Sequence, residues 1–180
     1  MKTLILFNKP FQVMCQFTDK EGRQHLGHHI EDKGVYAAGR LDYDSEGLLL
    51  LTDNGPLQHR ITSSEYNKTY LVQVEGLAKK AQLDSLRKGV KVQDYVAKAV
   101  SVALLHKKPG FVWKRTPPIR QRKNKPTTWI EVTLNQGKNR QVRRMMAAVG
   151  LPVLRLIRTQ IGDWKLNDLP LGEKKIVTID

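Results

Sequence analysis

The chain has 180 residues, and its 31 lysines and arginines exceed its 17 aspartates and glutamates, which gives a formal net charge of +14. Such a length can bury a sizeable core and suits one domain or two closely packed lobes. The excess of positive charge favours an anionic polymer as partner, with nucleic acid ahead of an anionic membrane surface.

The same counts exclude several classes of protein. Cys15 is the only cysteine, so an intrachain disulfide framework and a thiolate zinc cluster are excluded. The apolar stretch near the start spans about four residues, which is too short for the core of a signal peptide, and no run approaches a membrane span. We therefore expect a cytoplasmic protein that does not associate with a membrane.

The first half of the chain predicts mostly strands. Residues 4–7 are apolar and predict a strand, which ends where a proline follows because proline cannot donate to a ladder. Residues 47–52 predict a buried strand, and the Asp-Asn-Gly at 53–55 is typical of a turn. Residues 56–61 can start a short helix. Residues 68–74 alternate and are rich in β-forming side chains, so they predict another strand.

The second half continues this mixture. Helices are predicted where leucines or methionines recur at helical spacing, and strands where polar and apolar residues alternate. In chain order we expect a helix over 78–88, a hairpin or meander over 90–102, a strand over 127–134, a helix over 139–149, and strands over 153–161 and 175–179. Many strands with few short helices predict an α+β fold, with flanking short helices on a mixed, mostly antiparallel sheet.

The positive charge is concentrated in two blocks that contain no acidic residue. Residues 106–125 hold eight lysines and arginines, with Phe111 and Trp113 among them, and predict an extended loop or a long hairpin tip. This segment is either a solvated connector or an RNA-binding element, basic for phosphates and aromatic for stacking. Residues 138–158 hold six more. The candidate RNA contacts in the two blocks are Lys114, Arg115, Arg122, Lys123, Arg140, Arg144 and Arg158.

The stretch GRLDYDSEGLLLLTDNG, residues 39–55, alternates Asp42, Asp44 and Glu46 and then continues into four leucines. Its spacing is close to that of a calcium-binding loop. However, such a loop lies between two helices and ends in a bidentate glutamate, whereas this one continues into a predicted strand and ends in Asp53. The remaining interpretations are a solvated acidic turn and the setting of one catalytic carboxylate.

This stretch resembles the GRLD motif of the pseudouridine synthases, in the family of ribosomal small-subunit pseudouridine synthase A. LILFNKP, KTYLVQVEG, GKNRQVRRM and LIRTQIG are similar to four further motifs of that family, in the same order and over nearly the whole chain. The resemblance implies one catalytic domain over residues 1–180, with two intimate lobes and a central RNA-binding cleft. Relatives often carry an N-terminal RNA-binding module of the S4 type, which we do not expect here, so the catalytic domain itself has to bind the substrate.

The resemblance also implies roles for individual residues. Asp42 is the carboxylate that attacks the nucleotide, and Arg143 is the cation that keeps it ionised and oriented. Tyr70 stacks on the flipped base and is the acid or base for the C5 proton. Leu156 forms an apolar pocket wall, and Arg40 contacts phosphate or fills the space that the flipped base leaves. Asp44 and Glu46 are expected to structure the loop or pair with arginines.

Isomerising uridine needs no redox change and no group donor, so neither a cofactor nor a metal is expected. Resemblance to the large-subunit members of the family implies one uridine in large-subunit (23S) ribosomal RNA as the target, and we expect a monomer. Two alternatives from other classes stay open. A non-catalytic RNA-binding or ribosome-assembly protein fits the composition equally well. A nuclease fits less well, because no histidine pair or carboxylate cluster lies outside the Asp42 loop.

Overall fold

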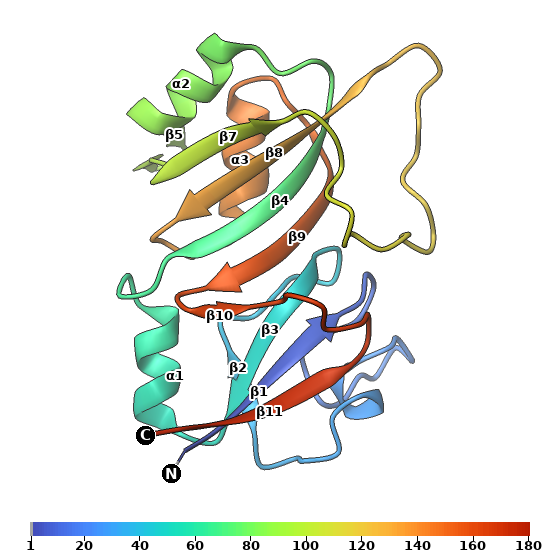
Figure 1. The fold of residues 1–180 in the computed structure, drawn as a ribbon, viewed down its shortest axis with the longest axis vertical. Coiled ribbons are helices and arrows are strands. Elements are labelled where there is room, and N and C mark those ends of the chain that lie inside the picture. Colours follow the sequence, from blue (N-terminus) through green and yellow to red (C-terminus); the bar gives the residue numbers. More distant parts are fainter. Residues whose placement is uncertain (1) are drawn as a thin grey trace.

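The computed structural model describes residues 2–180, and Met1 lies outside the described part. It confirms an α+β fold on one mixed, mostly antiparallel sheet with short helices (Figure 1). The main path through this sheet is β11-β1-β3-β9-β4-β8-β7. The elements are β1 (Lys2–Lys9), η1 (Leu26–His28), β2 (Tyr36–Ala38), β3 (Glu46–Thr52), α1 (Gly55–Thr62), β4 (Lys68–Glu75), α2 (Lys80–Lys88), β5 (Val90–Val92), β6 (Tyr95–Ala97), β7 (Ser101–Leu105), β8 (Thr127–Leu134), α3 (Gln141–Ala148), β9 (Val153–Ile161), β10 (Trp164–Lys165) and β11 (Lys174–Ile179).

Two lobes share this sheet. The upper lobe in Figure 1 contains the long antiparallel strands β9, β4, β8 and β7, with α2, α3 and the β5–β6 hairpin on one face. The lower lobe contains β1, β2, β3 and β11, with α1 beside them. β1 pairs with β11, so both ends of the described chain lie together at the bottom of the lower lobe.

The sheet is narrowest where the lobes meet. β3 and β9 run parallel there and pair at only two positions, Glu46 with Ile157 and Gly47 with Arg158. Gly47 has a φ of +100°, and a Cβ at this position would collide with the carbonyl oxygen of Arg158. Glycine is therefore required for the two strands to approach each other. Beyond this point the lobes diverge.

The leucine run Leu48–Leu51 forms β3 and is completely buried. Successive side chains of a strand point to opposite faces, so both faces of β3 must be covered. Leu48 and Leu50 pack in the cluster that contains Leu57 and Ile61 of α1, whereas Leu49 and Leu51 pack in the cluster of Leu26 and Ile30. This burial on both faces explains why the run is continuously apolar rather than alternating.

Residues 106–126 form the expected extended loop, which joins the antiparallel strands β7 and β8 and projects beside the sheet (Figure 1). Short elements outside the apolar runs, η1, β2 and β10, were not expected. Within residues 2–180, no helix has the length and hydropathy needed to cross a bilayer.

Candidate active site

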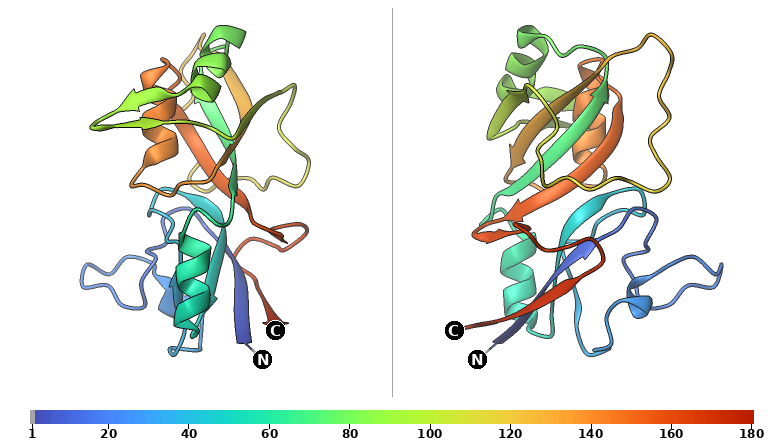
Figure 2. Two further views of the ribbon diagram at one scale, coloured as in Figure 1. Left: turned by 90° about the vertical axis from the view of Figure 1, so that its left-hand side faces the viewer. Right: turned by 45° about the vertical axis from the view of Figure 1, so that its right-hand side comes forward.

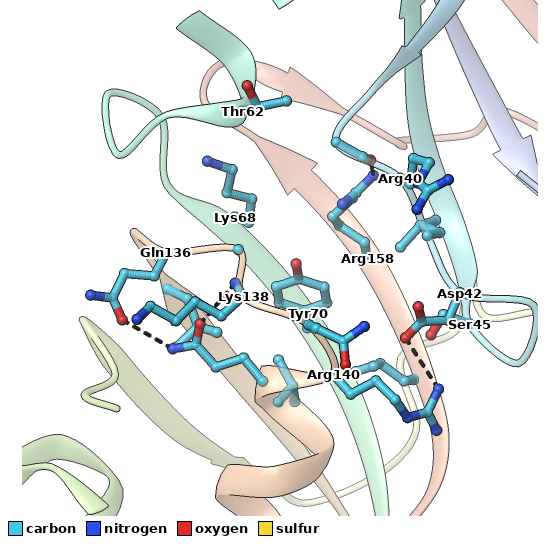
Figure 3. Close-up of a pocket in the computed structure, with 18 of the residues that line it drawn as sticks. Arg40, Asp42, Ser45, Thr62, Lys68, Tyr70, Gln136, Lys138, Arg140 and Arg158 are labelled. Atoms are coloured by element: carbon cyan, nitrogen blue, oxygen red, sulfur yellow. Dashed lines mark hydrogen bonds and ion pairs between the residues drawn. The ribbon is translucent and has the colours of Figure 1, made fainter. Parts of the chain in front are cut away.

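A pocket of about 510 Å³ lies between the lobes (Figure 3). Residues 37–45 and α1 supply its lower wall, and β4, β9 and residues 134–142 supply its upper wall. Six of the twelve predicted site residues line it, namely Arg40, Asp42, Tyr70, Arg140, Leu156 and Arg158. The other six lie outside it, namely Lys114, Arg115, Arg122, Lys123, Arg143 and Arg144.

Asp42 lies in the loop between β2 and β3, in a turn closed by a hydrogen bond from the Ser45 amide to the Asp42 carbonyl (3.0 Å). Its side chain is 40% exposed and faces the pocket. Arg140 Nη1 lies 3.2 Å from Asp42 Oδ2, so a guanidinium from the upper lobe pairs with a carboxylate from the lower lobe. An ion pair of this kind orients the carboxylate.

The sequence interpretation paired Asp42 with Arg143, and the structure corrects this. Arg143 donates to the carbonyl oxygen of Asp44 (2.8 Å) and lies 3.5 Å from the Asp44 carboxylate. Arg140, just before α3 with a left-handed φ of 52°, directs its side chain toward Asp42 and Asp44. Arg143 lies in the first turn of α3 and contacts Asp44 rather than Asp42.

Asp44 joins both arginines. It accepts from Arg140 at 3.0 and 2.9 Å in addition to the contacts with Arg143. Burial raises the pKa of the Asp44 carboxyl, but the hydrogen bonds of Arg140 and the charges of Arg143 and Arg140 outweigh it, so this pKa lies below its usual value. The expectation that Asp44 pairs with nearby arginines is confirmed.

Tyr70 and Leu156 come from adjacent strands of the upper lobe and face the pocket opposite Asp42. Tyr70 is 8% exposed and Leu156 is 6% exposed. Figure 3 shows the Tyr70 hydroxyl pointing into the pocket rather than into the core. A base that entered the pocket would meet a ring, an aliphatic wall and a carboxylate. The pocket is thus suited to a planar, partly apolar group.

Arg158 lines the pocket but is only 4% exposed. Its guanidinium donates to the carbonyl oxygens of Leu48 (2.9 Å) and Gly39 (2.7 Å). Arg158 therefore holds the backbone on either side of Asp42, and its contact with RNA phosphate stays a prediction.

Two buried lysines near the pocket were not predicted from the sequence. Lys68 lies two residues before Tyr70, on the same face of β4, and donates to the Ser63 carbonyl (2.6 Å). Lys9 is fully buried and donates to the carbonyl oxygens of Pro10 (2.8 Å) and Val13 (2.9 Å). Burial lowers the pKa of Lys9 to about 8. The alternation of β4 could have identified Lys68, but no pattern marks Lys9 as a group that supports a loop.

The pocket rim at residues 135–140 was also missed. Gln141 is buried at the start of α3, where its side-chain Nε2 donates to Gln136 Oε1 (3.2 Å) and its side-chain Oε1 accepts from the backbone amide of Lys138 (3.2 Å). Lys138 Nζ lies 4.0 Å from the centre of the Tyr95 ring on the β5–β6 hairpin. Within α3, Arg144 donates to Gln93 of the same hairpin (2.6 Å). An exposed and a half-buried cation are thus held in place on this side of the pocket.

The basic loop lies differently from the expected RNA-binding arm. Trp113 is not free to stack on a base, because it packs inward and donates to Glu46 Oε1 (2.9 Å). Arg115 donates to the carbonyl oxygens of Pro117 and Leu154, and Arg122 lies 3.7 Å from Glu75. Lys114, Lys123 and Phe111 are exposed. The loop therefore combines an anchored centre with exposed charges on its flanks.

The calcium-loop interpretation is contradicted by the positions of its four acids. Asp42 and Asp44 pair with Arg140, and Glu46 is buried against Arg155. Asp53 lies at the opposite end of β3. Within residues 2–180 the structure has no group of three or more His, Cys, Asp or Glu side chains placed to hold a metal ion.

Comparison with known proteins agrees with this geometry. The model of the RNA pseudouridylate synthase family matches residues 3–148. Ribosomal large subunit pseudouridine synthase E of Vibrio parahaemolyticus is 46% identical over 180 residues, covering 99% of this chain and 75% of that protein. Its namesake in Xanthomonas campestris pv. campestris is 48% identical, covering 96% and 94%.

One solved structure, the crystal structure of a pseudouridylate synthase, superposes with a TM-score of 0.78 at 28% identity, covering 99% of this chain and 71% of that one. The fold, the sequence motifs and the relatives agree. The chain therefore belongs to the RNA pseudouridylate synthase family and is an enzyme that isomerises uridine in RNA to pseudouridine.

Proposed function

We propose that this enzyme modifies one uridine in large-subunit ribosomal RNA, with Asp42 as its reactive carboxylate. The observation that carries the catalytic part is the position of Asp42 in the pocket, beside Arg140 and opposite Tyr70. The target is supported by the relatives named ribosomal large subunit pseudouridine synthase E. We further propose that it acts on this RNA in the cytoplasm, as a monomer.

The reaction breaks the N1–C1′ bond, turns the base and forms the C5–C1′ bond, while C5 loses a proton and N1 gains one. The Asp42 carboxylate has to be ionised whether it attacks C1′, attacks C6 or assists formation of a glycal. Arg140 contacts this carboxylate directly. Arg143 pairs with Asp44 instead, and we propose that its role is to add positive charge near Asp42 without a direct contact. The Tyr70 hydroxyl faces the pocket and is proposed to relay the C5 proton.

The target assignment is tested by mapping pseudouridines in ribosomal RNA from cells with and without this gene. We expect one site to disappear from the large-subunit RNA and to return with the wild-type gene, but not with Asp42→Asn. An unchanged large-subunit RNA would contradict the proposed target. A site lost from another RNA would leave the catalytic role of Asp42 intact and redirect the search for the substrate.

Activity is expected to persist in excess EDTA without added metal. All the carboxylates of the 39–55 stretch near the pocket are neutralised by arginines, and none needs a cation from solution. The measurement is the rate of pseudouridine formation with and without chelator on an RNA whose folding is shown to be unaffected. Loss of activity in EDTA that calcium restores would reverse this conclusion.

The main electrostatic contacts with RNA are proposed to lie at the mouth of the pocket, at Arg40 and Lys138, and beside it at Arg144. Phosphate contacts release counterions, so each one adds about 0.7–0.9 to the slope of log affinity against log salt. Replacing these three residues with serine is expected to flatten the slope by roughly two to three units. The exposed loop cations Lys114, Arg122 and Lys123 are proposed to contribute less, because the centre of their loop packs behind the sheet.

A matched pair of triple-serine variants tests this arrangement. One lacks Arg40, Lys138 and Arg144, and the other lacks Lys114, Arg122 and Lys123, so both lose three positive charges. Salt titrations of RNA binding are expected to show the larger change in slope for the rim variant. A larger change for the loop variant would restore the basic loop as the principal RNA-binding element.

A further inference from the structure

The centre of the basic loop crosses the junction between the lobes. We call residues 112–115 the strap. Val112 is 4% exposed and packs with Leu71, Trp129 and Ile157 of the upper sheet. Trp113 then contacts the first residue of β3, Glu46, through its indole nitrogen. The Arg115 guanidinium lies 4.0 Å from the centre of the ring of Phe11, which follows β1. The strap thus contacts both lobes.

The strap lies on the face of the sheet opposite the pocket. Leu71 and Ile157, which contact it, are the immediate neighbours of Tyr70 and Leu156, which line the pocket. Adjacent side chains of a strand point to opposite faces. The left panel of Figure 2 agrees, with the loop between β7 and β8 on one side of the strands and α3 on the other. The strap therefore contributes no side chain to the reacting groups.

A buried ionic network fastens the strap to the junction. Glu46 is fully buried, and its carboxylate accepts from Arg155 Nε (2.8 Å) and Nη2 (2.9 Å) as well as from Trp113 Nε1 (2.9 Å). Glu46 begins β3 in the lower lobe, and Arg155 lies on β9 in the upper lobe. The three side chains therefore join both lobes and the strap at the point where β3 meets β9.

This network is not expected to add much to the free energy of folding. Removing two charges from water is costly, and apolar residues of similar size often replace a buried ion pair without loss of stability. What the network does supply is fixed direction, since the bidentate pair and the indole donor have defined geometries. Direction matters at this junction, because β3 and β9 pair at only two positions. Asp42 precedes the junction by four residues in the lower lobe, and Tyr70 belongs to the upper lobe.

We propose that the strap is a brace which sets the angle between the lobes and thereby the spacing of Asp42 from Tyr70. Glu46, Arg155 and Trp113 are its positioning residues. The inference rests on the proposed role of Asp42, and it goes further by assigning a catalytic consequence to contacts on the face remote from the substrate.

The test combines Glu46→Met with Arg155→Met, which replaces the ion pair by apolar side chains of similar length. We expect the unfolding midpoint of this double variant to equal that of the wild type and its RNA Kd to change less than twofold. Its single-turnover rate at saturating RNA is expected to fall at least tenfold. The matched control is Arg60→Met with Glu65→Met, which removes an exposed bidentate pair within the lower lobe. This control is expected to change neither rate nor affinity. Wild-type turnover in the junction variant would overturn the proposal.

Trp113→Phe provides a second test that can be used if the double variant does not fold, because it removes only the indole donor. Spin labels at His59→Cys and Lys88→Cys, in a Cys15→Ala background, report the distance between the lobes without any dependence on activity. We expect the distance distribution to broaden and the turnover rate to fall while affinity is kept. An unchanged distribution would overturn the brace. If the distribution broadens but the enzyme keeps its activity without Asp42, the brace stands and the proposed role of Asp42 is refuted.

Discussion

Replacing Asp42 with asparagine or alanine is expected to abolish pseudouridine formation while RNA binding survives. Neither side chain can act as a nucleophile or carry the negative charge that stabilises the altered nucleotide, and removal of such a group elsewhere costs about 10⁴- to 10⁶-fold in turnover. Binding is expected to stay equal or become tighter, because a carboxylate that faces an anionic substrate is removed. Tritium release from C5-labelled uridine measures turnover, and RNA titration measures affinity.

Asp53→Asn is the matched control for this prediction. It makes the same chemical change within the same sequence motif, but at the exposed far end of β3. Full activity is expected for this variant. Appreciable turnover by Asp42→Asn would exclude Asp42 as the reactive carboxylate, and loss of RNA binding together with turnover would point to a structural role for its pair with Arg140.

Gly47→Ala is expected to destabilise the protein by about 4 kcal/mol or more, which belongs to the exceptional range for one substitution. The new methyl group would collide with the Arg158 carbonyl and with Ile157, at a φ of +100° that side chains avoid. Neither strand can yield easily, because Arg158 also binds the carbonyl oxygens of Leu48 and Gly39. The free energy of unfolding in denaturant is the measurement.

Gly76→Ala is the control that separates the cost of the steric collision from the cost of the backbone strain. Its φ is +99°, nearly that of Gly47, but a Cβ there has no atom within 4 Å. Gly76→Ala is therefore expected to cost only the strain, about 1–2 kcal/mol. Equal losses for the two variants would show that the β3–β9 junction can adjust, and would weaken the argument that close approach of these strands sets the arrangement of the lobes.

Periodicity predicted most of the sheet. The strand at residues 127–134 has the expected bounds, and the leucine run is a buried strand because both its faces are covered. The short elements η1 and β2 carry no such signal. β2 has only three residues, and its pairing with β3 depends on contacts that the sequence of the segment does not reveal.

The site was predicted less completely than the fold. The motifs identified Asp42 and Tyr70, which the structure brings to one pocket, but not the partner of Asp42. Arg140 and Arg143 are both arginines of one short basic stretch, and the sequence gives no sign that Arg140, whose backbone is left-handed, is the one that reaches Asp42. Charge patterning likewise marked Arg158 and Arg115 as candidate contacts with RNA. Composition cannot distinguish an arginine that binds phosphate from one that binds buried carbonyl oxygens.

The pairing of β1 with β11 has a consequence for how the protein is made. The upper lobe is formed by the continuous stretch from β4 to β9, whereas the sheet of the lower lobe needs strands 2–9 and 174–179 together. Contacts so distant in sequence form slowly, and during synthesis they must wait for the second partner. The upper lobe can therefore fold on the ribosome while one edge of β1 is still unpaired. Asp42 belongs to the lobe whose sheet needs residues 174–179, so we expect activity to depend on the presence of β11.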